Sequence, residues 1–180
     1  MGKATQDLRS EHDAILHVLD IVDIVVADSD RDPAEVLNFG GELIYFLRTF
    51  ADKCHHGKEE NILFTEMVRR GVPNEGGPIG VMLMEHKLGR EYIGQMTDAV
   101  DDHGLERFEE AAEKYRDLLR PHIEKENTVL FVMADRLLDD AAQDELFEKF
   151  EQHEESVIGY GVHEQLHGMI HQWEVEFGSQ

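Results

Sequence analysis

The chain has 180 residues, which is long enough to bury a continuous hydrophobic core without disulfides or structural zinc. We expect residues 1–180 to form one domain. The 17 Lys and Arg residues against 39 Asp and Glu residues give a formal net charge of −22, and no block is rich in Lys and Arg. This composition argues against nucleic acid and anionic membranes as partners.

The composition also bears on compartment and on metal. No apolar run approaches the roughly 20 residues that span a bilayer, and residues 1–10 are polar rather than a signal peptide. We therefore expect a cytoplasmic protein. The single cysteine, Cys54, forbids an internal disulfide, and we interpret it as a small buried hydrophobe without a further role. Eleven histidines in so acidic a chain are a first hint of metal.

The first half of the chain predicts two helices. Apolar residues recur at three and four positions, the period of amphipathic helices, and no convincing strand is found. The first helix is expected over residues 6–27. Asp32 and Pro33 form a good N-cap and N1 pair, and they open a long second helix that should end near Gly71.

The middle of the chain continues this pattern. Residues 71–77 are rich in Gly and Pro and predict a loop. A third helix is expected over residues 78–101, and a short break at His103 separates it from a fourth helix over residues 105–138. Pro121 removes one backbone hydrogen bond from the fourth helix and should interrupt it with a kink.

The last segment, residues 140–177, is again helical in pattern, with a break near Gly159 and Gly161. Four long helices with short connections favour an antiparallel bundle, which we place over residues 6–138. The C-terminal helical extension would pack beside that bundle. The predicted fold class is therefore all-α.

Histidine and glutamate recur four residues apart, which places both side chains on one helix face. Such pairs also arise by chance in an acidic, His-rich chain, so the spacing alone proves little. An internal repeat is more specific: residues 55–64 match residues 122–131 without a gap, with the same His, Lys, Glu, Leu and Phe. A ligand pair repeated on two helices is what a two-fold-like metal site in a bundle needs.

The repeat also selects a register on the second helix. Glu126 precedes Leu130 by four residues, and only Glu59 stands in that relation to Leu63. We therefore expect His55 and Glu59 to point into the bundle, rather than His56 and Glu60. Adjacent α-helical residues differ by about 100°, so His56 should be rotated to the edge of the bundle.

The apolar stripe of the fourth helix includes Glu126. An ionised carboxylate at a core position without a partner would cost several kcal/mol, which a metal would remove. In the alternative, Glu126 lies at the edge of the stripe and reaches water. His12 and His86 stand among apolar residues on the first and third helices, so each helix supplies an inward His. Four imidazoles and two carboxylates suit iron or manganese, with the carboxylates bridging two ions.

These residues resemble the hemerythrin-like, or HHE cation-binding, family. The likeness covers residues 6–138, and it is most similar to the iron-centre-repair and iron-sensing branches. It implies an up-down-up-down four-helix bundle with a carboxylate-bridged centre of two iron ions, for which manganese or zinc can substitute. The stretches that carry the likeness are Glu11-His12, residues 55–64, Pro78-Ile79 through Glu85-His86, and residues 122–131. The implied metal ligands are His12, His55, Glu59, His86, His122 and Glu126.

Two departures from the oxygen-carrying members bear on function. The carriers have a second His four positions after the one on the third helix, where this chain has Arg90. They also use Asp five positions after the fourth-helix His, where this chain has Glu126 at four. The resemblance thus implies one ligand fewer than in the carriers and a more open site.

Other patterns have competing interpretations. Residues 163–167 match the HExxH pattern of zinc proteases, but no third ligand or substrate-binding strand is visible, and an amphipathic surface helix explains them as well. His163, His167 and His171 would then bind at most a stray ion. Tyr115 shares the face of His122. We interpret it first as a core aromatic, with a role as a neighbour of the metals as the less favoured alternative.

Three function classes follow. The first is a di-iron protein that senses oxygen or nitric oxide, or handles iron, rather than one that carries oxygen. The second is a di-iron redox enzyme, for which no catalytic residue can be named. The third is a metal-free helical interaction bundle. The expected partner is a small diatomic ligand, oxygen or nitric oxide, or iron itself, and a homodimer is left open.

Overall fold

The computed structural model describes residues 2–178, and within that range all regular secondary structure is helical, with no strand. Two helical stretches form the first half of the bundle. α1 (Lys3–Ala27) is followed by a turn in which the Asp32 carboxylate accepts a hydrogen bond from the Ala34 amide. The second stretch changes its backbone hydrogen-bond pattern along its length. Its segments are α2 (Pro33–Phe46), η1 (Leu47–His56), η2 (Glu59–Leu63) and α3 (Phe64–Arg69).

The second half repeats this organisation. α4 (Pro78–Asp101) begins at the expected proline and ends before the expected break, where His103 adopts a positive φ of 55°. The fourth stretch then comprises α5 (Leu105–Lys125), η3 (Glu126–Leu130) and α6 (Phe131–Leu137). The helix is not interrupted at Pro121, as the sequence had suggested. α5 continues through it, and the change of bonding comes later, at Glu126.

The segments named η are π-helical, with backbone hydrogen bonds from residue i to i+5. The placement of η2 and η3 follows the sequence repeat. Glu59 is the first residue of η2 and Glu126 is the first residue of η3, so the two matching carboxylates open matching π-helical turns. Such turns occur often at functional sites.

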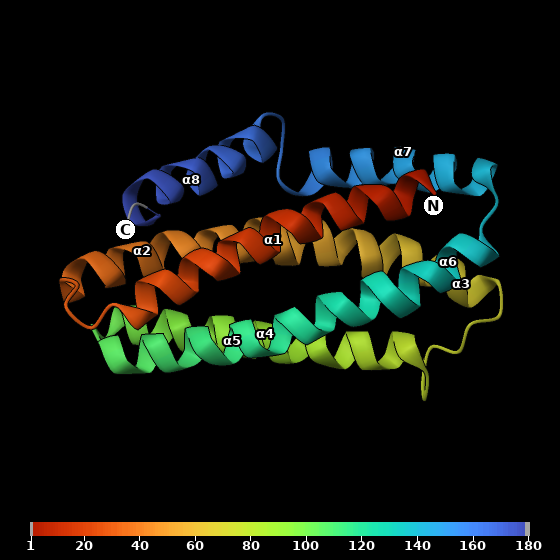
Figure 1. The fold of residues 1–180 in the computed structure, drawn as a ribbon. Coiled ribbons are helices and arrows are strands. Elements are labelled where there is room, and N and C mark those ends of the chain that lie inside the picture. Colours follow the sequence, from red (N-terminus) through yellow and green to blue (C-terminus); the bar gives the residue numbers. More distant parts are fainter. Residues whose placement is uncertain (1, 179–180) are drawn as a thin grey trace.

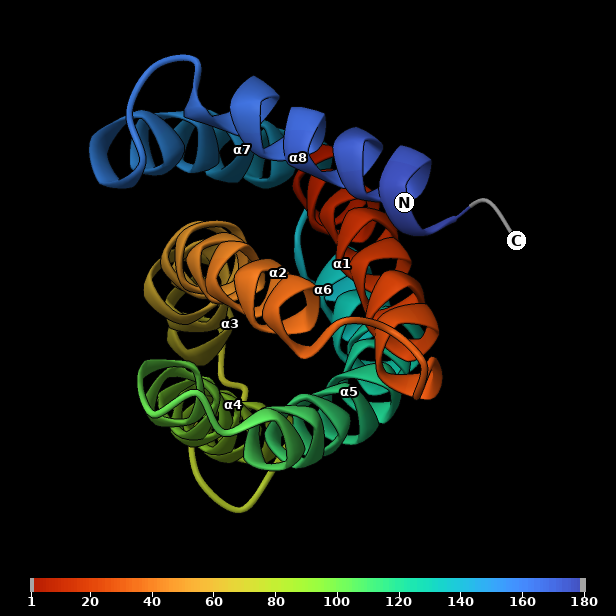
Figure 2. The same ribbon diagram turned by 90° about the vertical axis from the view of Figure 1, so that its left-hand side faces the viewer.

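The four stretches form an up-down-up-down bundle, with successive stretches antiparallel (Figure 1). Viewed along the bundle, α1, α2, α4 and α5 surround a common centre, and the last two helices lie outside α1 and α2 (Figure 2). These are α7 (Asp140–Val157) and α8 (Val162–Phe177). Gly159 and Gly161, with φ of 87° and 77°, make the break between them that the sequence predicted.

The C-terminal helices are anchored by aromatic packing and charge. Trp173 of α8 is fully buried and meets the ring of Phe39 edge-on, with centroids 5.3 Å apart. Its indole N–H donates a hydrogen bond to Glu42 at 2.8 Å.

No helix within residues 2–178 combines the length and the apolar character needed to cross a bilayer. The all-α bundle with a C-terminal extension is thus confirmed.

Two hydrophobic cores fill the bundle. The larger contains Ile15, Ala51, Ile93 and Leu119, and it continues under α8. The smaller contains Leu8 and Leu63, among others, and it continues under α7. Between the two cores, every bundle stretch carries polar residues.

Candidate metal centre

A layer of buried polar side chains crosses the bundle between its two cores. Each member is at most 3 % exposed. All four stretches contribute to the layer, and the sequence had predicted every member but one. The members are His12, His55, His56, Glu59, His86, His122 and Glu126.

The unpredicted member is His56, and the expectation that it lies at the bundle's edge is wrong. It is 3 % exposed, and its ring stacks on that of His86. The reason is the π-helical bonding of η1, in which both histidines lie. Bonding from i to i+5 puts more residues into each turn, so neighbouring side chains are closer in angle than on an α-helix, and both His55 and His56 reach the interior.

The donor atoms of the layer fall into two groups. In each group the nitrogen and oxygen atoms that can bind a metal all lie within 4.8 Å of one another. One group is made of imidazoles alone, and the other combines imidazoles with carboxylates. The first is His56, His86 and His122, and the second is His12, His55, Glu59 and Glu126.

Both carboxylates of the second group also face imidazoles of the first group. One oxygen of Glu126, Oε2, is 3.2 Å from Nε2 of His12 and 3.2 Å from Nε2 of His122. Glu59 places Oε1 3.5 Å from Nε2 of His55 and Oε2 3.4 Å from Nε2 of His86. Each carboxylate therefore faces imidazoles of both groups, which is the position of a ligand that bridges two ions.

Several of these atoms have no hydrogen-bond partner within the described residues. They are Nε2 of His12, Nε2 of His55, and both oxygens of Glu59 and of Glu126. A buried polar atom without a partner costs about 1–3 kcal/mol, and more when it is charged. The neighbouring imidazoles, His122 foremost, hold the pKa of Glu126 well below its usual range against the effect of burial, so this carboxylate is ionised. The alternative in which Glu126 reaches water is wrong, because its exposure is 0 %. The donor set thus fits a cation.

The other ring nitrogen of four layer histidines is fixed by a partner. Each Nδ1 lies 2.7–2.9 Å from an acceptor oxygen, so Nδ1 carries a proton and Nε2 is the ring nitrogen that faces the layer. Such outer partners orient metal-binding imidazoles. The sequence analysis had assigned no role to these partners. The pairs are His12 with Asn127, His55 with Glu11, His86 with Glu60, and His122 with Glu85.

Glu60 and Arg90 gain a role from this arrangement. Glu60 does not join the layer, and its carboxylate Oε1 is 2.7 Å from Nδ1 of His86. Arg90, at the position of the carriers' second helix-three His, donates to the same oxygen at 2.7 Å and to Asp52 at 2.7 Å. The guanidinium therefore holds the carboxylate that orients His86, while His56 supplies the additional imidazole.

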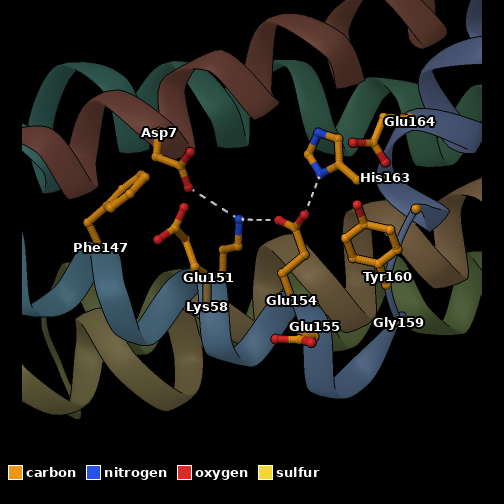
Figure 3. A pocket seen from close by; sticks show the side chains of 11 residues that line it. Asp7, Lys58, Phe147, Glu151, Glu154, Glu155, Gly159, Tyr160, His163 and Glu164 are labelled. Carbon is orange, nitrogen blue, oxygen red and sulfur yellow. Dashed lines mark hydrogen bonds and ion pairs between the residues drawn. The ribbon is translucent and has the colours of Figure 1, made fainter.

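A buried ammonium supports the His55 side of the layer. Lys58 is 2 % exposed and lies 2.6 Å from Glu11, 3.0 Å from Glu154 and 3.2 Å from Asp7. Glu11 in turn accepts from His55 at 2.8 Å. Lys58 forms the inner wall of a surface cavity of about 470 Å³ under α7 and α8 (Figure 3). Lys58 and Glu11 therefore connect the cavity to His55 of the layer through charged contacts.

Two further residues lie apart from the donor groups. Tyr115 is buried in the larger core, where burial raises the pKa of its hydroxyl, and it belongs to neither group. Cys54 is fully buried with its sulfur 3.7 Å from Glu154, and burial raises the pKa of the thiol well above its usual value. Neither residue has the environment of a metal-binding thiolate or phenolate.

The HExxH residues do not form a protease site. His163 and His167 lie on one face of α8, as the spacing requires. Within the described residues, the metal-compatible group that contains His163 also contains Glu11 and Glu154 but not His167, and Lys58 already occupies the space between those carboxylates. Among residues 2–178, no third metal-compatible residue joins both histidines.

Comparison with known proteins agrees with the geometry. The family model for the hemerythrin HHE cation binding domain matches residues 3–134, which is most of the chain and all but the end of the bundle. No curated protein and no solved structure matches the chain significantly. The chain belongs to the hemerythrin HHE cation-binding domain family.

Proposed function

We propose that the buried layer holds two iron ions bridged by Glu59 and Glu126, and that the protein senses oxygen or nitric oxide, or handles iron. The observation that carries the proposal is the position of the two carboxylates, whose oxygens are unpartnered and face imidazoles of both donor groups. Imidazole and carboxylate donors suit iron, with manganese or zinc as substitutes.

The residues of the chain would divide the work. The second group, through His12 and His55, would hold one ion, and the first group, through His56, His86 and His122, would hold the other. The Nδ1 partners of His12, His55, His86 and His122 keep each Nε2 directed inward, so these four ligands are oriented before a metal binds. Bound iron would supply reversible electron transfer and an affinity for diatomic molecules.

Sensing or iron handling, rather than oxygen carriage, needs support other than a missing ligand. His56 makes up for the imidazole absent at Arg90, so the argument from an open position does not hold for this fold. The support comes instead from the chain of Lys58 and Glu11 to His55, which brings proton-carrying groups from an acidic surface cavity to the layer. A long-lived oxygen adduct is disfavoured where protons reach the site.

A redox enzyme acting on an organic substrate has less support. None of the seven layer residues lines the cavity of Figure 3, so a substrate bound in that cavity would not contact the layer. A metal-free bundle is opposed by the cost of leaving the layer's oxygens unpartnered.

The test is metal analysis and optical spectroscopy of protein purified without oxygen. We expect about two iron ions per chain, near-ultraviolet absorption that bleaches with dithionite, and rapid reaction of the reduced protein with oxygen or nitric oxide. Zinc at one per chain that is lost in His167→Ala but kept in His122→Ala would contradict the assignment of the site. A stable, reversibly dissociating oxygen adduct would restore the carrier function.

A further inference from the structure

A histidine pair on α8 stands outside the bundle and outside the part of the chain that the family matches. His163 and His167 are one helical turn apart, and their rings stack with centroids 4.7 Å apart. Their Nε2 atoms are 2.9 Å apart and share one hydrogen bond. Only one of two such nitrogens can carry the proton, so the other presents a lone pair.

Two neighbours hold this pair in place. The Glu154 carboxylate of α7 lies 2.9 Å from Nδ1 of His163, an ion pair drawn in Figure 3. Phe50 of η1 packs edge-on against both rings, with centroids 5.5 Å from His163 and 5.8 Å from His167. A carboxylate at Nδ1 is the usual outer partner of a metal-binding histidine, since it directs the Nε2 lone pair outward.

We propose that His163 and His167 form a second metal site, which binds one divalent transition-metal ion through both Nε2 atoms. Two imidazole nitrogens on one tetrahedral zinc ion are about 3.3 Å apart, given bond lengths near 2.0–2.1 Å. The observed 2.9 Å therefore needs an adjustment of only a few tenths of an ångström. Residues i and i+4 of a helix are a recognised chelating pair.

The protonation states of the two rings make this binding dependent on pH. Metal binding requires the Nε2 proton of His167 to move to Nδ1, and this side chain is exposed, so water can hydrogen-bond the relocated proton. Partial burial and the neighbouring His163 lower the pKa of His167, which favours its neutral ring. The Glu154 carboxylate raises the pKa of His163, so the metal must displace a proton from that ring, and binding should strengthen as pH rises. With two protein ligands, water would fill the remaining positions, as in an open site.

The site differs in kind from the acidic cluster beside it. The carboxylates of Glu11 and Glu154 already have a cation between them, the Lys58 ammonium. A metal ion at the histidine pair would instead bind through two uncharged nitrogens, and Glu154 would act only through His163. Borderline ions such as Zn²⁺ and Ni²⁺ prefer such donors, whereas Mg²⁺ and Ca²⁺ prefer oxygen.

The test is calorimetric titration with Ni²⁺ of protein whose bundle site has first been loaded with iron. His163→Ala and His167→Ala are compared with His171→Ala, which removes an exposed histidine one turn further along α8. We expect one Ni²⁺ to bind the unmodified protein and the His171→Ala variant alike. Either other variant should weaken this binding at least about tenfold, and Glu154→Gln should weaken it to a smaller degree.

Circular dichroism and iron content would show that each variant is folded and keeps its bundle site. The proposal is overturned if Ni²⁺ binds both alanine variants as tightly as the unmodified protein. It is equally overturned if His122→Ala in the bundle abolishes the same Ni²⁺ signal, because the ion would then occupy the bundle. If the bundle binds a different metal, the protein is loaded with that metal before the titration.

Discussion

The imidazole of His56 stacks on that of His86, with ring centroids 3.8 Å apart and planes inclined by 16°. The two residues come from different helical stretches, η1 and α4. In the oxygen carriers, the resemblance places the corresponding second imidazole on the same helix as the His86 equivalent. Here the imidazole beside His86 comes from a neighbouring stretch instead, and this relationship changes what a substitution at His56 should do.

We expect His55→Ala and His56→Ala each to lose most of the bound metal. Each removes one imidazole from a different donor group, and loss of one ligand weakens a two-ion site that shares bridging carboxylates. The measurement is metal content per chain after identical loading. His103→Asn is the control, because His103 is exposed at a helix break and Asn accepts its positive φ. Full metal retention in His56→Ala would place this ring outside the metal site.

Lys58→Met should destabilise the fold by about 3 kcal/mol, since it leaves the buried Glu11 carboxylate, with the partly buried Asp7 and Glu154, without its cation. The matched control is Lys149→Met, which removes an exposed ion pair with Glu145 and should cost less than about 1 kcal/mol. Urea unfolding of both variants in the metal-free form gives the comparison. Equal costs would show that Lys58 is hydrated and not an internal counter-ion.

The ion pair between Glu154 and His163 predicts a pH window for the packing of α7 and α8. The imidazole of His163, together with Lys58, lowers the pKa of Glu154 from 4.5 to about 2, so its contribution to stability is lost as pH falls below about 4.5. The Glu154 carboxylate raises the pKa of His163 above 6.5, so that contribution is complete below 6.5 and is lost as pH rises through the raised value.

The difference in unfolding free energy between the unmodified protein and His163→Ala should therefore be largest between about pH 4.5 and 6.5. The measurement is urea unfolding across this range in a metal chelator. His171→Ala serves as the reference, because its ring is mostly exposed. A difference that does not vary with pH would mean that the ion pair contributes nothing to stability.

Gly57→Ala should destabilise the protein by about 1–3 kcal/mol, because a methyl group there would collide with the ring of His153 on α7. That ring also contacts the Lys53 carbonyl, at 3.0 Å, and cannot move without losing this contact. The same change at Gly41, which has open space around it within α2, should stabilise the helix by about 0.5–1 kcal/mol. Thermal unfolding would show opposite shifts, and the double variant with His153→Ala should recover part of the loss.

Helix boundaries and most of the polar layer could be predicted from the sequence, because their signals are local. The Asp32 cap, the proline at 78 and the glycines at 159 and 161 act through their own backbone geometry. Glu126 was recognisable because a carboxylate in an apolar stripe contradicts its surroundings. The repeat then carried the same inference to Glu59.

What the sequence did not predict depends on contacts between distant segments. Nothing in the periodicity of η1 distinguishes π-helical from α-helical winding, so the inward position of His56 was missed. Glu11 and Glu85 look like ordinary surface acids in their own helices. Their roles appear only when another helix brings His55 or His122 against them. Gly57, directly after the two histidines, leaves room for the His153 ring of α7, which is a local sequence signal for close packing of α7.

The polar layer divides the interior into two cores, and this division has a consequence for cooperativity. Without metal, the smaller core around Leu8, Leu63 and Phe131 is joined to the larger one through buried charges rather than apolar contacts. We expect its amides to exchange hydrogen through openings that leave the larger core intact. Bound metal would cross-link all four stretches at the boundary, so both cores should then open together. Native-state hydrogen exchange would therefore detect the ion as a merger of two folding units into one.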